Sequence, residues 1–193
     1  MKVSGRHAFT ASRLNVWNAL QDADVLAATL PGARRLAPTG PDEYAITVDV
    51  GVGSVKGTYD GTFALTDKQE REACTVRATA SGRPGSVTAV AQMRLADEGA
   101  GAVLTYEADA SVTGPLAGVG QRLMGAAARR TTEQFLNALD DYIVAPPEAG
   151  PARRLERASP RAGSDPKVLA ASALGGFLLA LIGVAVGRWT ARR

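Results

Sequence analysis

Residues 104–139 read LTYEADASVTGPLAGVGQRLMGAAARRTTEQFLNAL, and the spacing of apolar residues changes within this stretch. Up to Val112, apolar and polar residues alternate, which is typical of a strand with one buried face. From Pro115 to about Tyr142 the apolar residues recur at steps of three and four, which predicts one long amphipathic helix. Glycines weaken the first half of this helix. Its predicted apolar stripe comprises Leu116, Val119, Leu123, Ala127, Thr131, Phe135 and Leu139.

The same alternation recurs upstream and predicts further strands separated by Gly-rich turns. Two short helices are expected after the first strand, one capped by Ser12 and one starting at Asp22 or Asp24, with a stop at Pro31-Gly32. The one-sided alternation indicates an antiparallel sheet with one face in water. The predicted strands lie near residues 3–9, 33–39, 44–50, 54–66, 76–81, 87–95 and 104–112.

The inward-facing positions of the predicted sheet carry unusually small residues, among them Gly5, Gly61, Ala89 and Ala108. A sheet wrapped around a helix needs bulk to fill the space between them. Either the helix lies very close to this small-residue floor, or a cavity remains that could hold a small molecule. The sequence leaves both alternatives open.

The chain has one cysteine, Cys74, and one histidine, His7. This excludes a zinc or iron–sulfur site built from several Cys and His residues, and no metal ligands are predicted. The strand carboxylates Asp49, Asp60, Glu107 and Asp109 alternate onto the polar face, away from a cavity. General acid–base catalysis inside the sheet would therefore depend on His7 or tyrosines, so we predict no catalytic residues.

Residues 168–187, VLAASALGGFLLALIGVAVG, contain no charged residue. A helix of this length spans about 30 Å, the thickness of the hydrocarbon core of a bilayer. Lys167 precedes the segment, and basic residues with Trp189 follow it, as at a membrane interface. Residues 168–193 are therefore predicted to form a C-terminal membrane anchor. Its expected lipid-facing residues are Val168, Leu174, Phe177, Leu178, Leu181, Ile182 and Trp189.

Residues 144–167 are rich in proline and arginine and predict a flexible linker between a head at 1–143 and the anchor. The head carries slightly more acidic than basic residues, and the excess positive charge lies in the tail. Such a distribution points to anionic lipid and not to nucleic acid. The N-terminus contains no apolar run of a secretory signal, so the head is expected at the cytoplasmic face of the cell membrane.

The order of a strand, two short helices, six strands and a long helix resembles the helix-grip fold of the START/SRPBCC superfamily. Within it, residues 1–142 resemble the CoxG-like proteins of carbon monoxide dehydrogenase. The resemblance is carried by VWNALQDADVLAATLPGARRL at 16–36, GVGSVKGTYDGTFALTD at 51–67 and the stretch at 104–139. It implies an α+β fold with a curved antiparallel sheet of about seven strands around the long helix.

The resemblance also implies a non-enzymatic accessory protein of a molybdenum CO dehydrogenase or related hydroxylase. The expected ligand is an apolar small molecule, namely a respiratory quinone (menaquinone or ubiquinone), held in the helix-grip cavity. Two alternatives remain open: a membrane-recruitment protein without a ligand, and a cyclase- or dehydratase-like enzyme. The candidate ligand-binding residues are His7, Trp17, Tyr44, Tyr59, Phe63, Met93, Tyr106, Leu123, Ala127 and Phe135.

Overall fold

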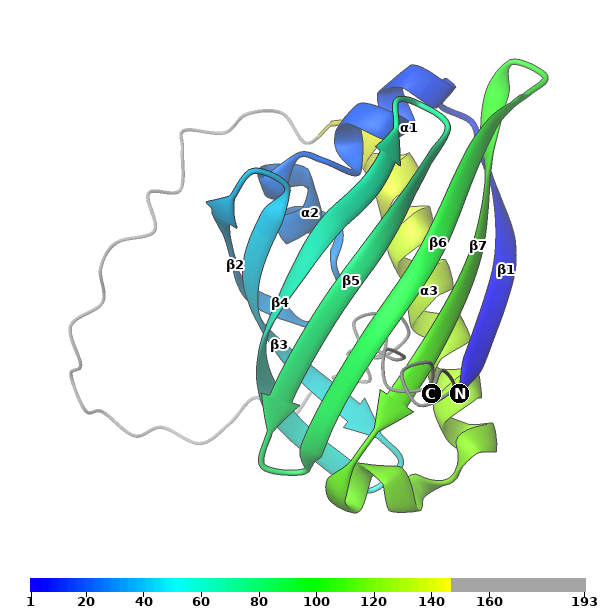
Figure 1. Cartoon of the computed structure of the whole chain (residues 1–193). Helices are drawn as coiled ribbons and strands as arrows, with labels where there is room; N and C mark the ends of the chain where they lie inside the picture. The colour runs from blue at the N-terminus through cyan, green and yellow to red at the C-terminus, as the bar shows by residue number, and fades with distance from the viewer. Residues whose placement is uncertain (147–193) are drawn as a thin grey trace, which may run out of the picture.

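The computed structural model describes residues 1–146, which form one α+β unit (Figure 1). Every predicted strand and both predicted short helices are present. The elements are β1 (Lys2–Phe9), α1 (Arg13–Ala19), α2 (Ala23–Thr29), β2 (Ala33–Gly40), β3 (Glu43–Val52), β4 (Val55–Gln69), β5 (Ala73–Gly82), β6 (Gly85–Glu98), β7 (Gly101–Val112), the 3-10 helix η1 (Gly114–Val119) and α3 (Gln121–Val144).

The seven strands form a single sheet in the order β1-β7-β6-β5-β4-β3-β2. All neighbouring strands are antiparallel, as the one-sided alternation predicts. The sheet curves around α3, and α1 and α2 lie at the end where α3 finishes (Figure 1). The inner face of the sheet, α3 and the two short helices enclose the core.

The two short helices begin at the predicted caps. The Ser12 hydroxyl accepts a hydrogen bond from the Asn15 backbone N–H, and one oxygen of Asp22 accepts from the N–H groups of Asp24 and Val25. These bonds satisfy donors that have no partner within the first turn of a helix. Of the two predicted starts for the second helix, Asp22 is the correct one.

The prediction of one continuous helix from Pro115 is wrong. Residues 114–119 form the 3-10 helix η1, and Gly120 then adopts φ 92° and ψ 141°, a conformation outside the helical region. A new helix begins at Gln121, so its apolar stripe does not continue the phase of residues 115–119. Met124 is buried in α3, whereas the predicted stripe residue Leu123 is 48 % exposed. The break at Gly120 ends the predicted continuous helix, but Leu123 is exposed for another reason. At about 100° per residue, Leu123 lies roughly 120° around α3 from the buried Phe135, whereas Met124 lies within about 20° of it.

The C-terminal segment predicted to cross the membrane lies outside the described residues, and so do its seven predicted lipid-facing positions. Among residues 1–146 no helix is long and apolar enough to cross a bilayer. The last described helix ends at Val144, close to the predicted head boundary at residue 143.

Candidate ligand-binding interior

The helix α3 does not lie directly on the small-residue floor of the sheet. Its backbone approaches β1, α1 and α2 most closely, and the central strands β4 to β7 stay farther away. Direct packing of a helix on alanine and glycine would bring the two backbones close together over several positions. The arrangement therefore argues against the first alternative, in which α3 packs closely on the small-residue floor of the central strands.

Neighbouring side chains cover glycines on the inner face of the sheet, and two of these neighbours are tyrosine rings. A methyl group at Gly5 would collide with the Tyr106 hydroxyl, and one at Gly82 would lie 3.1 Å from the Tyr59 ring. Gly57 is covered in the same way by Pro84. The absence of a side chain at these positions thus gives Tyr59 and Tyr106 room to lie over the sheet.

Three buried side-chain atoms have no hydrogen-bond partner among the described residues: His7 Nε2, the Tyr59 hydroxyl and Gln134 Oε1. Tyr59 is 1 % exposed, and burial raises the pKa of its hydroxyl. His7 and Gln134 are half-buried, on β1 and α3 respectively. A buried polar atom without a partner costs about 1–3 kcal/mol, so such groups normally contact water or a ligand.

His7 lies on β1 with its ring 4.7 Å from the Phe9 ring, in an edge-on arrangement. Burial lowers the pKa of His7, while the carboxylates of Asp140 and Glu133 on α3 act in the opposite direction. The net effect favours the neutral imidazole, which has one donor and one acceptor nitrogen. A neutral His7 could therefore either donate to or accept from a guest molecule.

Tyr44 differs from Tyr59 because its hydroxyl already has a partner. It donates to the Gln21 carbonyl at 2.8 Å, and the Tyr44 ring stacks on Phe63 with centroids 4.8 Å apart. Burial also raises the pKa of Tyr44. Tyr44 therefore ties β3 to the α1–α2 connection and forms an aromatic wall with Phe63, but its hydroxyl is occupied.

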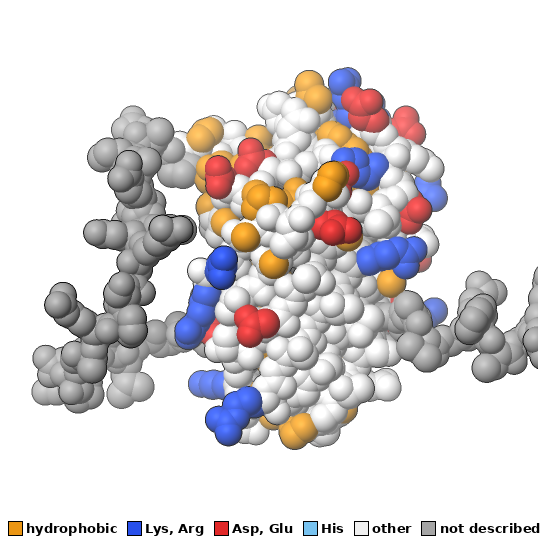
Figure 2. Space-filling view, turned by 60° about the vertical axis from the view of Figure 1, so that its left-hand side comes forward, with side chains coloured by type: hydrophobic (Ala, Val, Ile, Leu, Met, Phe, Trp, Pro, Cys, Tyr) orange, Lys and Arg blue, Asp and Glu red, His pale blue; other side chains and the backbone are white. Residues whose placement is uncertain are grey.

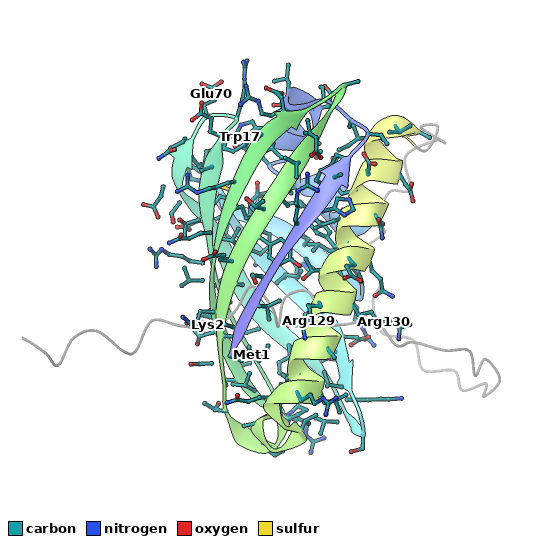
Figure 3. All side chains as sticks on the ribbon, turned by 90° about the vertical axis from the view of Figure 1, so that its right-hand side faces the viewer. Met1, Lys2, Trp17, Glu70, Arg129 and Arg130 are labelled. Atoms are coloured by element: carbon teal, nitrogen blue, oxygen red, sulfur yellow. The ribbon has the colours of Figure 1, made fainter. Side chains whose placement is uncertain are left out.

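Burial raises the pKa of Tyr106 as well, and Thr132 of α3 lies beside its hydroxyl. Tyr106 thus reaches from β7 across Gly5 to the helix, close to β1. Figure 3 shows β1 and α3 side by side along this edge of the interior.

The structure buries most of the remaining predicted site residues in the core, but not all. Ala127 and Phe63 are half-buried. Leu123 is exposed and lies outside the core, and its predicted contact with a ligand stays a prediction. The buried members of the set are Trp17, Met93 and Phe135.

Gln134 is not among the site residues that the sequence predicts. It lies seven residues after Ala127, two helical turns along the same side of α3, so a search for polar residues at that spacing could have found it. A polar residue beside an apolar stripe normally faces water, which is why the pattern alone gave no indication of burial.

Neither the strand carboxylate Asp49 nor the thiol of Cys74 is placed for catalysis inside the sheet. Asp49 lies on the outer face, where Arg34 and Thr58 bind its carboxylate and hold its pKa low. Burial raises the pKa of Cys74 to about 11, which keeps the thiol protonated and unreactive. Residues 1–146 contain no group of three His, Cys, Asp or Glu residues that could hold a metal ion.

Two open hollows of about 390 and 750 Å³ lie on the outer face of the sheet. The first is lined by residues such as Thr62, Thr79 and Val90, and the second by Ser4, Gln92 and Glu107. These side chains alternate with the inward-facing ones, so neither hollow is the predicted interior site.

Residues 5–144 match the family described as CoxG, a subunit of carbon monoxide dehydrogenase. The chain belongs to the CoxG family. The match covers all of the described fold except the first four and the last two residues. It confirms the resemblance found in the sequence. None of the curated proteins matches the chain.

Solved structures similar to this CoxG-family chain include a conserved protein from Geobacillus kaustophilus, with 27 % identity and a TM-score of 0.72, covering 75 % of this chain and 95 % of the other. A START superfamily protein from Mycobacterium smegmatis has 15 % identity and a TM-score of 0.57, with 74 % and 97 % covered. The Zhui aromatase/cyclase from Streptomyces sp. R1128 has 16 % identity and a TM-score of 0.55, with 75 % and 93 % covered. At 15 % and 16 % identity, the last two structures show that the START-like fold is shared, and they say nothing about activity.

Proposed function

We propose that this protein is a non-catalytic accessory protein that binds a respiratory quinone between the sheet and α3. It would hold the quinone beside the membrane for a molybdenum CO dehydrogenase or a related hydroxylase. The family supports the accessory role and the kind of enzyme. The apolar segment at 168–187 supports attachment to the membrane.

The proposal of a bound ligand rests on the buried polar atoms that have no hydrogen-bond partner in an otherwise apolar interior. A quinone has a flat ring with carbonyl oxygens and an apolar chain. The Tyr59 hydroxyl can donate to a carbonyl oxygen, and so can a ring N–H of His7. Tyr44, Phe63 and Phe135 supply flat apolar walls, which are typical of small-molecule sites that contain a few polar groups.

The residues of the chain would bind and orient the quinone without chemical change. The neutral form of His7, favoured by burial, avoids placing a charge beside an apolar ligand. A choice between menaquinone and ubiquinone would depend on how the interior fits the ring, and the experiment below distinguishes them.

Extraction of the purified full-length protein with organic solvent, followed by mass spectrometry, tests this proposal. We expect menaquinone or ubiquinone at a stoichiometric level. Tyr59→Phe should retain about three- to tenfold less quinone, because one hydrogen bond contributes about 0.5–1.5 kcal/mol. Tyr44→Phe is the matched control and should retain quinone as the wild type does, since its hydroxyl is bound to Gln21.

A protein without quinone, even after incubation with vesicles that contain menaquinone or ubiquinone, would contradict ligand binding. If that empty protein still copurified with the dehydrogenase, the alternative of a recruitment protein would take its place. Turnover of a polyketide-like compound, lost in His7→Ala, would instead indicate an enzyme.

A further inference from the structure

The two ends of the described fold differ in charge. One end, which we call the glycine-rich end, consists of the β3–β4 turn (52–56), the β5–β6 turn (82–86) and residues 114–123. These segments contain Lys56, Arg83 and Arg122 but no Asp or Glu. The opposite end carries the β4–β5 and β6–β7 turns and the end of α3 (Figure 1). Its acidic residues include Asp42, Glu43, Asp67, Glu70, Glu72, Asp97, Glu98, Asp140 and Asp141.

The views of the whole molecule agree with this division. In Figure 2 the lower end shows basic and apolar side chains, and most of the visible acidic ones lie in the upper part. In Figure 3 the labelled Lys2 lies toward the lower end and Glu70 at the upper end.

The cations of the glycine-rich end are also free of ion pairs within residues 1–146. Lys56, Arg83 and Arg122 are exposed, and no carboxylate of the described residues pairs with any of them. At the opposite end several cations are paired with carboxylates. The pairs there include Arg6 with Glu98, Arg13 with Asp97, Lys68 with Asp42, Arg71 with Glu70 and Arg77 with Asp67.

The glycine-rich end also exposes apolar surface on irregular backbone. Leu123 is 48 % exposed and lies over the tip of the β3–β4 turn, within 3.4 Å of where a methyl group at Gly53 would be. Methyl groups at Gly118 and Gly120 would meet no atom within 4 Å. This end therefore combines unpaired cations, an exposed leucine and open space.

We propose that the glycine-rich end docks on a bilayer that contains anionic phospholipids. Lys56, Arg83 and Arg122 lie against the headgroups, and Leu123 enters the interfacial layer. Anionic membrane surfaces attract such cations over about one Debye length and repel the acidic opposite end. The inference deepens the proposed function, because it names the face through which the tethered head meets the lipid.

The sequence permits this orientation although the described chain leaves α3 at the opposite end. A helix of the 24 residues of α3 is about 36 Å long. Residues 147–167 could reach roughly 70 Å if fully extended. The chain length before the predicted span thus suffices to bring the glycine-rich end to the membrane.

Site-specific quenching in the full-length protein tests the orientation. In a Cys74→Ala background, one fluorophore is placed at Ser54→Cys in the β3–β4 turn, and the matched control is placed at Glu70→Cys in the β4–β5 turn. Each protein is mixed with vesicles of equal parts phosphatidylcholine and phosphatidylglycerol that carry a headgroup spin label. We expect quenching at position 54 and none at position 70.

Each cation removed should weaken the docking roughly fivefold. The Lys56→Glu, Arg83→Glu, Arg122→Glu triple variant should therefore lose the quenching at position 54, as should vesicles of phosphatidylcholine alone or high salt. The Arg13→Glu, Lys68→Glu, Arg71→Glu variant has the same net charge and should keep the quenching.

Quenching at position 70, equal quenching at both positions, or none at either would overturn the docking proposal. Protection of position 54 by the dehydrogenase, without any effect of vesicles, would overturn it in favour of a protein partner. Quinone content, measured in the same preparations, reports separately on ligand binding. Sedimentation with phosphatidylcholine vesicles reports separately on the anchor, so the failures of the three proposals can be told apart.

Discussion

Tyr44 and Tyr59 lie on neighbouring strands and both face the interior, but only the Tyr44 hydroxyl has a hydrogen-bond partner among the described residues. Tyr59 is almost fully buried with an unpartnered hydroxyl, and such a group reduces the stability of a ligand-free protein. The two hydroxyls differ in hydrogen bonding because the two tyrosines lie at different positions along their strands. Tyr44 reaches the α1–α2 connection, whereas no polar group of residues 1–146 meets the Tyr59 hydroxyl.

This pair allows a stability test in the protein freed of ligand. Tyr59→Phe should leave the free energy of unfolding unchanged or raise it by up to about 1 kcal/mol, because it removes an unsatisfied group. Tyr44→Phe should lower it by about 1–2 kcal/mol, because the Gln21 carbonyl loses its donor. Urea unfolding of both variants measures the difference, and a larger loss for Tyr59→Phe would show that its hydroxyl is satisfied.

His7 should make the stability depend on pH. Burial holds its folded-state pKa below that of the unfolded chain, so the unfolded state binds the proton more readily. The stabilisation is present above about pH 6.5 and is lost as the pH falls from there toward the lower folded pKa. The free energy of unfolding should therefore decrease between about pH 7.5 and about pH 5.5. His7→Gln should reduce this decrease, since the chain contains no other histidine. An unchanged slope would contradict the burial argument.

At the scale of elements, the carboxylate of Asp140 joins the end of α3 to the connection that follows β1. Asp140 accepts hydrogen bonds from the Thr10 N–H and hydroxyl, at 3.1 and 2.9 Å, and from the Ala11 N–H at 3.3 Å. These bonds join residues far apart in the sequence and fix the helix at one end of the interior. The contact could not be predicted from spacing, because Asp140 and the exposed neighbour Asp141 look alike in the sequence.

Asp140→Ala should therefore destabilise the protein by about 1–3 kcal/mol, since it leaves donors of the β1–α1 connection without their acceptor. Asp141→Ala should change the free energy of unfolding by less than about 0.5 kcal/mol, as is usual for a surface substitution. Chemical denaturation of the two variants provides the comparison, and equal effects would argue against the proposed role of Asp140.

The junction between η1 and α3 provides a second test at this scale. Gly120 has a φ of 92°, so Gly120→Ala should cost about 1–3 kcal/mol. Gly118 has open space around it and no positive φ. Gly118→Ala should be neutral or stabilise the protein by up to about 1 kcal/mol. Thermal unfolding of the two variants distinguishes them, and an equal response would contradict the break at Gly120.

At the scale of the whole molecule, the last described helix ends at Val144, and the apolar segment at 168–187 follows the predicted linker. A chain that stops after Pro146 retains every described element and should fold. We expect it in the soluble fraction after cell lysis, whereas the full chain should sediment with membranes, because removal of the predicted anchor removes about 20 apolar residues from lipid contact. Sedimentation of the truncated head with membranes at high salt, where docking through surface cations is screened, would contradict the anchor.

The sequence by itself determined the order of the elements, the inward faces of the strands and the family, because alternation and capping are local patterns that burial on one face imposes. Only the tertiary structure decided where α3 begins, which residue of α3 enters the core and which buried hydroxyl lacks a partner. Met124 and not Leu123 lies in the core, because Met124 shares the side of α3 that carries Phe135, whereas steps of four residues drift around a helix of 3.6 residues per turn. Gln134 and Asp140 acquired their surroundings from segments distant in sequence, and hydrogen bonding between such segments depends on the three-dimensional packing, which no spacing of residues along the chain records.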